Sequence, residues 1–146
     1  MSVGRRINDP FSAFLFRVEI RGIVEGFFRE CSGLESTIQI QEDPTLGRGM
    51  MRKLPGRIVY ANITLRQGLT QSMNLYQWHL AALRGNIQRV NGSVIQVGPD
   101  GIAQLARWNF TDGWPTKYTG PSFNSSNNEL SIETFEIAHE GIERVA

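Results

Sequence analysis

The chain has 146 residues, enough for one domain with a sizeable core, and its 40% hydrophobic and 20% charged residues are ordinary for a globular protein. The formal net charge of +1 gives no reason to expect a nucleic acid or an anionic membrane as partner, and the single cysteine, Cys31, excludes an internal disulfide and a cysteine-based structural metal site. No stretch approaches the roughly 18 apolar residues of a membrane helix, and the first residues lack the apolar core of a secretory signal. We therefore expect the protein to be made and assembled in the cytoplasm.

The first half of the chain predicts strands. A short polar arm over 1–12 precedes alternating segments at 14–20 and 24–31. Segment 34–42 then alternates apolar residues with Glu35, Thr37, Gln39 and Gln41. Segment 57–66 alternates apolar residues with Tyr60, Asn62, Thr64 and Arg66. Both patterns are typical of half-buried strands that keep one polar face in water.

Between these two strands, residues 43–56 predict a long loop, because they include two prolines and three glycines. The loop also carries the cluster Arg48, Met50, Met51, Arg52 and Lys53. A solvated loop and a contact with an acidic protein surface both fit this composition. A nucleic-acid groove fits less well, because such grooves interleave basic residues with aromatic ones.

The second half predicts one helix, over 71–84, with Thr70 as N-cap and Gly85 after its C-terminus. Its apolar stripe runs through Met73, Tyr76, Leu80 and Leu83. Strands are expected at 87–97 and 103–112, joined by the turn Gly98-Pro-Asp-Gly101, and at 129–138; residues 113–128 read as irregular. Together these elements predict a single mainly-β domain with one helix over 1–146.

No catalytic, cofactor or metal site is predicted. The two histidines, His79 and His139, lie outside metal-ligand spacing and are interpreted as solvated or locally hydrogen-bonded. Cys31, at the end of a phenylalanine-rich strand, is interpreted as a small buried hydrophobic residue. The chain has no nucleophile elbow or phosphate-binding loop, so we expect that it is not an enzyme.

Several stretches, in order along almost the whole chain, resemble the tail tube proteins of contractile phages and of phage-tail-like contractile injection systems. They are Cys31-Ser-Gly-Leu-Glu35, Arg52–Thr64, Ala106–Phe110, Trp114–Pro121, Asn127–Thr134 and Ala138–Gly141. The resemblance implies two packed antiparallel sheets that form a tail-tube-like barrel flanked by one helix. It also implies hexameric rings that stack into a hollow tube.

For this chain, the resemblance assigns residues 43–56 to contacts between rings, through Arg48, Met50, Met51, Arg52 and Lys53. The suggested acidic partners are Glu129, Glu133, Glu136 and Glu140. The candidate lining of the lumen is Glu35, Thr37, Gln39, Gln41, Asn62, Thr64 and Arg66.

The implied partners are further copies of the chain, a sheath protein, baseplate or spike proteins, tube-terminating proteins, and a tape-measure protein and cargo in the lumen. The implied role is mechanical: the tube is driven through a target envelope when the sheath contracts. A secreted, ring-forming Hcp-like carrier of a type VI secretion system is the alternative. The sequence leaves open whether the particle is a phage tail or an injection system, and whether this chain is the main tube subunit or a paralogue near the baseplate.

Overall fold

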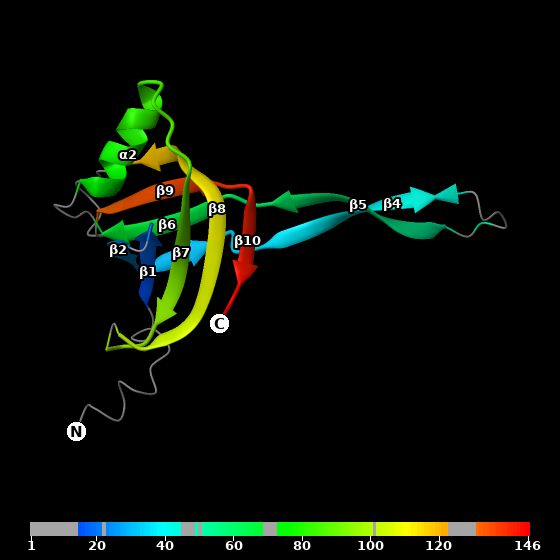
Figure 1. The fold of residues 1–146 in the computed structure, drawn as a ribbon, viewed down its shortest axis with the longest axis horizontal. Coiled ribbons are helices and arrows are strands. Elements are labelled where there is room, and N and C mark those ends of the chain that lie inside the picture. The colour runs from blue at the N-terminus through cyan, green and yellow to red at the C-terminus, as the bar shows by residue number, and fades with distance from the viewer. Residues whose placement is uncertain are drawn as a thin grey trace.

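The structure, a computed structural model, describes residues 15–21, 23–44, 49, 51–68, 73–100, 102–122 and 131–146 (Figure 1). The predicted N-terminal arm and Thr70 lie outside these residues. The elements are β1 (Leu15–Ile20), β2 (Ile23–Phe28), β3 (Glu30–Ser32), β4 (Ser36–Asp43), β5 (Arg52–Tyr60), β6 (Ile63–Gly68), α2 (Asn74–Leu83), β7 (Val90–Val97), β8 (Gln104–Thr119), β9 (Ile132–Ala138) and β10 (Gly141–Arg144).

One long strand, β8, joins two antiparallel sheets. The strand order is β2-β1-β7-β8-β9-β6-β3, with β10 also paired to β8. The first half of β8 pairs with β7 and β10, and its second half pairs with β9. The predicted fold class, mainly β with one helix, is confirmed. However, β2 and β3 stand at opposite ends of the strand order, so the sheets are not closed as a barrel.

The core lies between the two sheets and beneath the helix. It consists of Val18, Phe28, Ile63, Leu65, Leu75, Val94, Phe110, Phe135 and Ile137. A Cβ built at Gly113 would lie 2.4 Å from Cε1 of Phe110, so this glycine makes room for the aromatic ring. The prediction that residues 113–119 are irregular is therefore wrong: Gly113 and Pro115, which are typical of turns, lie inside β8.

The helix α2 packs against β8 and buries Leu75 and His79. His79 Nδ1 lies 3.1 Å from the carbonyl oxygen of Pro115, so the solvated reading of this histidine is wrong. The predicted stripe is also partly wrong, because Met73 is 50% exposed and Leu83 67% exposed. The face of α2 that is buried is instead the face that packs against β8.

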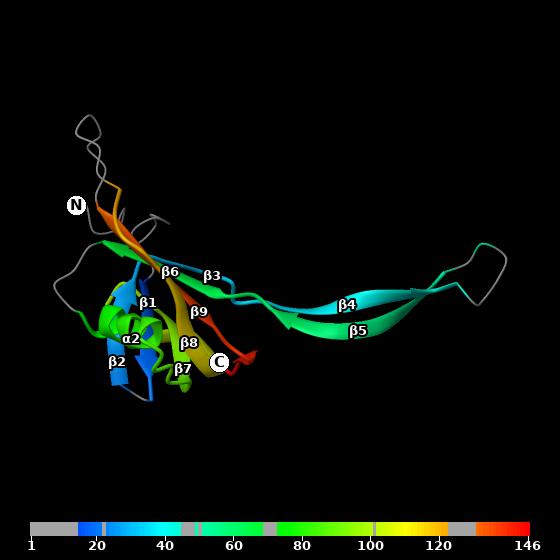
Figure 2. The same ribbon diagram turned by 90° about the horizontal axis from the view of Figure 1, so that it is seen from above.

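Strands β4 and β5 form a separate two-stranded sheet, called here the ribbon, which projects away from the remainder of the molecule, called the body (Figures 1 and 2). The predicted 43–56 loop is therefore too long: β4 runs to Asp43 and β5 begins at Arg52. Pairing with β4 keeps Pro55 and Gly56 extended, and a proline is tolerated on an edge strand.

Candidate assembly surfaces

The ribbon exposes apolar side chains to solvent. Ile38, Ile40 and Ile58 are 59%, 63% and 61% exposed. The prediction that segment 34–42 is half-buried in the subunit is therefore wrong, because no described helix or strand of the body covers the ribbon (Figure 2). An exposed apolar patch of this kind marks an interaction surface.

The pairing register separates the two faces of the ribbon. Ile38 lies opposite Ile58, and Ile40 lies opposite Pro55, so these four residues share one face, called the apolar face. The other face carries Thr37, Gln39 and Gln41, with Val59 opposite Thr37 and Leu54 opposite Gln41. A bulge between the two halves places Gly56 and Arg57 opposite Gln39.

The predicted contact cluster lies around the end of the ribbon. Arg48 and Met50 are outside the described residues, and Met51 is 52% exposed. Arg52 and Lys53 are exposed on β5, where they lie opposite Asp43 and Glu42 of the same ribbon. The ribbon therefore pairs positions of opposite charge near its end.

The alternation along the sequence shifts by one position where the ribbon joins the body, so odd positions face the core side in β6 and even positions in the end of β5 next to the junction. Leu65 and Ile63 of β6 are buried in the core, yet Tyr60 rather than Ala61 continues the core side, since its ring contacts His139 at 5.7 Å between centroids. On the other strand, Leu34 packs against the core cluster. The predicted row from Tyr60 to Arg66 therefore does not share one face.

A polar face lies on the outer side of the sheet β8-β9-β6-β3, opposite the core. Its members alternate with core residues: Glu30, Ser32, Thr64, Arg66, Lys117, Thr119, Thr134 and Glu136. Ion pairs cross the strands, Arg66 to Glu30 at 3.7 Å and Lys117 to Glu136 at 3.8 Å. Since Leu34 and Tyr60 lie on the core side, the Thr37–Gln39–Gln41 face of the ribbon continues this polar face.

Of the predicted lining residues, Thr64 and Arg66 belong to the polar face, and Thr37, Gln39 and Gln41 lie on its continuation. Glu35 and Asn62 are exposed at the junction between ribbon and body. Sequence reasoning missed the β9 and β8 contributions, Lys117, Thr119, Thr134 and Glu136. The alternation of Thr134 and Glu136 with Phe135 and Ile137 was the available signal.

Two strand edges of this sheet have no strand partner among the described residues. β3 pairs with β6 on one side only. On one side of β8, β7 pairs only with residues up to Gly113, and His79 bonds to the carbonyl oxygen of Pro115. The edge of β8 on this side is therefore open from Lys117 to Thr119. Open edges are the usual places where sheets of separate chains join.

Beside the β3 edge lies an open groove of ≈ 440 Å³, which Cys31 helps to line. Burial raises the pKa of the Cys31 thiol to about 12. We expect the thiol to react with an aromatic disulfide reagent at pH 8 about a thousandfold more slowly in the folded protein than after unfolding, since the thiolate is the nucleophile. The rate at which the coloured aromatic thiol is released, measured with and without denaturant, checks this. Equal rates would show that the Cys31 thiol is not buried in the folded protein.

One carboxylate of β9 is buried. Glu133 is 5% exposed and accepts hydrogen bonds from Gln67 Nε2 at 2.8 Å and from the Tyr118 hydroxyl at 3.1 Å. Burial, and then the bond to Glu133, raise the pKa of Tyr118. The suggestion that Glu133 meets a cation of another ring is wrong, because the side chain faces the core. Glu129 lies outside the described residues, and Glu140 binds Arg89 at 3.2 Å.

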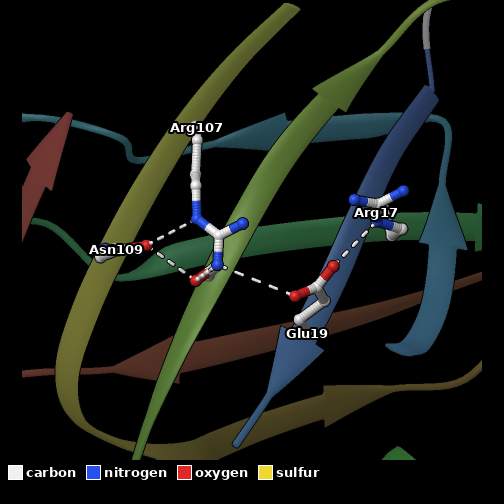
Figure 3. Close-up of polar contacts among 5 residues, drawn as sticks. Arg17, Glu19, Arg107 and Asn109 are labelled. Atoms are coloured by element: carbon white, nitrogen blue, oxygen red, sulfur yellow. Dashed lines mark hydrogen bonds and ion pairs between the residues drawn. The ribbon is translucent and has the colours of Figure 1, made fainter. Parts of the chain in front are cut away.

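On the outer side of the other sheet, charged side chains form a network across β1, β7 and β8 (Figure 3). Glu19 accepts a hydrogen bond from Arg17 Nε at 3.0 Å and lies 3.8 Å from Arg107. Arg107 donates to Asn109 at 3.1 Å and to Ser93 at 3.0 Å. Each member has a partner here, so the network fastens three strands together.

Within the described ranges, no group of histidine, cysteine and acidic residues could hold a metal ion. No helix in that same part of the chain is long and apolar enough to cross a membrane. What the geometry offers is therefore a set of contact surfaces: an exposed ribbon, two open edges and a polar sheet face.

Solved structures with a similar fold include chains of contractile injection systems and an Hcp protein. The chain is similar to one in an extracellular contractile injection system, a PVC sheath-tube complex in the extended state, with a TM-score of 0.76 and 23% identity over 100% of this chain and 98% of the other. It is similar to one in the PVC sheath/tube terminator, with a TM-score of 0.74 and 25% identity over 90% and 93%. Hcp1 from Flavobacterium johnsoniae has a TM-score of 0.56 and 20% identity over 89% and 94%.

No curated protein sequence matches the chain. Residues 12–143 match the family described as T4-like virus tail tube protein gp19. The chain belongs to this family and is a contractile tail tube protein.

Proposed function

We propose that this chain is the structural inner-tube subunit of a contractile injection system, and that its work is mechanical rather than enzymatic. The observation that carries the proposal is the ribbon, which exposes three isoleucines that the subunit itself does not cover. An exposed apolar surface of this kind marks a site that another chain covers. Membership of the tail tube family makes another copy of this chain the natural partner.

Rings would close through the two open edges. The β3 edge of one copy would pair with the Lys117–Thr119 edge of β8 in the next, which gives both of these edges a hydrogen-bonded partner. This pairing would extend the polar face around the ring, so that the lumen is lined by paired charges and hydroxyl groups. A lining of this kind holds few apolar side chains to which cargo could adhere.

Rings would stack through the ribbon. Its apolar face would pack on the next ring, and the charged positions at its end, including Arg52 and Lys53, would contact acidic groups there. Arg48, Met50 and Met51 stay part of this proposed contact. Covering both the sheet edges and the ribbon would make the tube stiff.

The partners we propose beyond the chain itself are a sheath protein, a tube terminator, baseplate and spike proteins, a tape-measure protein and cargo. The similarity to chains in a sheath-tube complex and in a sheath/tube terminator supports the first two. We further propose that the subunit assembles in the bacterial cytoplasm and acts in a released or anchored particle. An Hcp-like carrier remains the alternative, which the tail tube family match disfavours.

Negative-stain electron microscopy of the purified protein, concentrated at low and at moderate salt, tests this function. We expect rings or stacked tubes with a central hole, and stacks that shorten as salt rises if charges join the rings. If the protein stays monomeric alone, the measurement is repeated with its baseplate proteins. A failure to form tubes in their presence contradicts the proposed function.

A further inference from the structure

The ribbon is joined to the body by a short segment in which the two strands that enter the ribbon do not pair with each other. The β3–β6 ladder ends at the pair Ser32–Thr64, and the β4–β5 ladder begins at Ser36–Tyr60. Three residues on each strand separate the two ladders. Because the two strands do not pair with each other through this junction, side-chain contacts there can set the direction in which the ribbon projects.

His139 makes such a contact from the end of β9, the strand that pairs with β6 beside the junction. It lies at the corner between β9 and β10, and its Nε2 is 2.9 Å from the carbonyl oxygen of Ala61, in the junction. Its ring centroid is 5.7 Å from that of Tyr60, at the base of the ribbon, and 6.3 Å from that of Phe110, in the core. The imidazole therefore bridges the core and the ribbon.

The hydrogen bonding of His139 is unusual. A carbonyl oxygen only accepts, so Nε2 carries the proton and Nδ1 is left as an acceptor. Nδ1 is buried and, among the described residues, is the one buried side-chain nitrogen or oxygen without a hydrogen-bond partner. An unsatisfied buried group costs free energy, so the Nε2 bond to Ala61 and the ring contacts must offset this cost.

We propose that His139 is a positioning residue that sets the direction of the ribbon relative to the body, and so prepares it to meet the next ring. The second half of this statement rests on the proposed function. The Nε2–H group holds the Ala61 carbonyl, and the flat ring separates Tyr60 from Phe110. Together these two contacts hold a junction in which the two strands of the ribbon do not pair with each other.

The test compares His139→Leu, which removes the bond and keeps bulk, with His139→Gln, whose amide can donate to the Ala61 oxygen. His79→Gln is the matched control, because His79 is also buried beside a backbone carbonyl, that of Pro115, but far from the ribbon. Spin labels are attached at Gln41→Cys on the ribbon and at Gln104→Cys on the body, in a Cys31→Ala background. The distance between the two labels, measured in the dilute subunit by pulsed electron paramagnetic resonance, reports the direction of the ribbon.

We expect one narrow distance distribution in the labelled parent, in His139→Gln and in His79→Gln, and a broadened or shifted one in His139→Leu. If His139→Leu does not fold, Tyr60→Leu, which removes the ring on the ribbon side, is expected to broaden the distribution instead. A distribution in the folded variant identical to that of the parent overturns the inference, whatever happens to the melting temperature.

Assembly is measured separately. The concentration at which tubes form is expected to rise about tenfold in His139→Leu and to return towards the parent value in His139→Gln. A broadened distribution with unchanged tube formation supports the positioning role of His139 and contradicts the proposed role of the ribbon. The two ideas can thus fail independently.

Discussion

The double substitution of Ile38 and Ile58 by serine is expected to leave a folded subunit that no longer forms tubes where the parent does. These side chains are 59% and 61% exposed in the subunit, so their removal costs the isolated fold little. In the proposed tube they are covered, and burying an isoleucine contributes about 2 kcal/mol, so the pair contributes about 4 kcal/mol per contact. That loss corresponds to a roughly thousandfold weaker association.

Sedimentation velocity and electron microscopy measure assembly, and circular dichroism with thermal melting verifies the fold. The matched control is Gln39→Ala with Gln41→Ala, which changes two positions on the other face of the same strand. This control is expected to assemble. The proposed ring contact through the apolar face would be contradicted if the isoleucine variant formed tubes of normal length. It would also be contradicted if the control lost assembly to the same extent.

Gly33→Ala is expected to destabilise the protein by about 3–4 kcal/mol and to lower its melting temperature by roughly 10 °C. Gly33 has a φ of +85°, and a Cβ there would lie 1.9 Å from the carbonyl oxygen of Asn62. An alanine thus meets both left-handed strain and a backbone atom that cannot move alone. The expected result is a loosened junction between β3 and β4 as well as a lower free energy of unfolding.

Gly85→Ala separates the two contributions. Gly85 follows the helix with a φ of +91°, and nothing lies within 4 Å of a Cβ built there. Gly85→Ala is expected to lower the free energy of unfolding by about 1 kcal/mol, from backbone strain alone. Thermal and denaturant unfolding of both variants give the comparison; similar values would show that the junction has enough freedom to accommodate the methyl group.

Local patterns in the sequence located most elements. Alternation predicted β1, β4, β7 and β9 to within a few residues, and Gly85 correctly marked the end of the helix. The second half of β8 and the whole of β10 were missed. In β8, Pro115 lies at a register shift of the β8–β9 ladder, where a proline is tolerated, and Gly113 makes room for the Phe110 ring. β10 has a single apolar residue, Ile142, in a strand of four.

The resemblance to tail tube proteins also came from the sequence, and the family match confirms it. The residues proposed for the lumen were chosen by alternation, and those proposed for the ring contact by their place in the long loop that the resemblance assigns to it. Alternation correctly separates the two sides of a strand. It does not reveal that the pattern shifts by one position at the junction, so that the same parity of residue number lies on opposite sides in β6 and in the adjoining end of β5. The placement of Tyr60 on the core side depends on His139, which is far away in the sequence.

The sequence by itself determined the class of protein, the β-rich composition of the fold, the single helix and the polar character of alternate positions, because these depend on neighbouring residues. Only the tertiary structure decided that β4 and β5 leave the body as a ribbon, which edges stay open, and which histidine holds the junction. Those features arise from pairing between strands distant in the chain, such as Ile63 of β6 with Ile137 of β9, and local periodicity carries no information about such pairs.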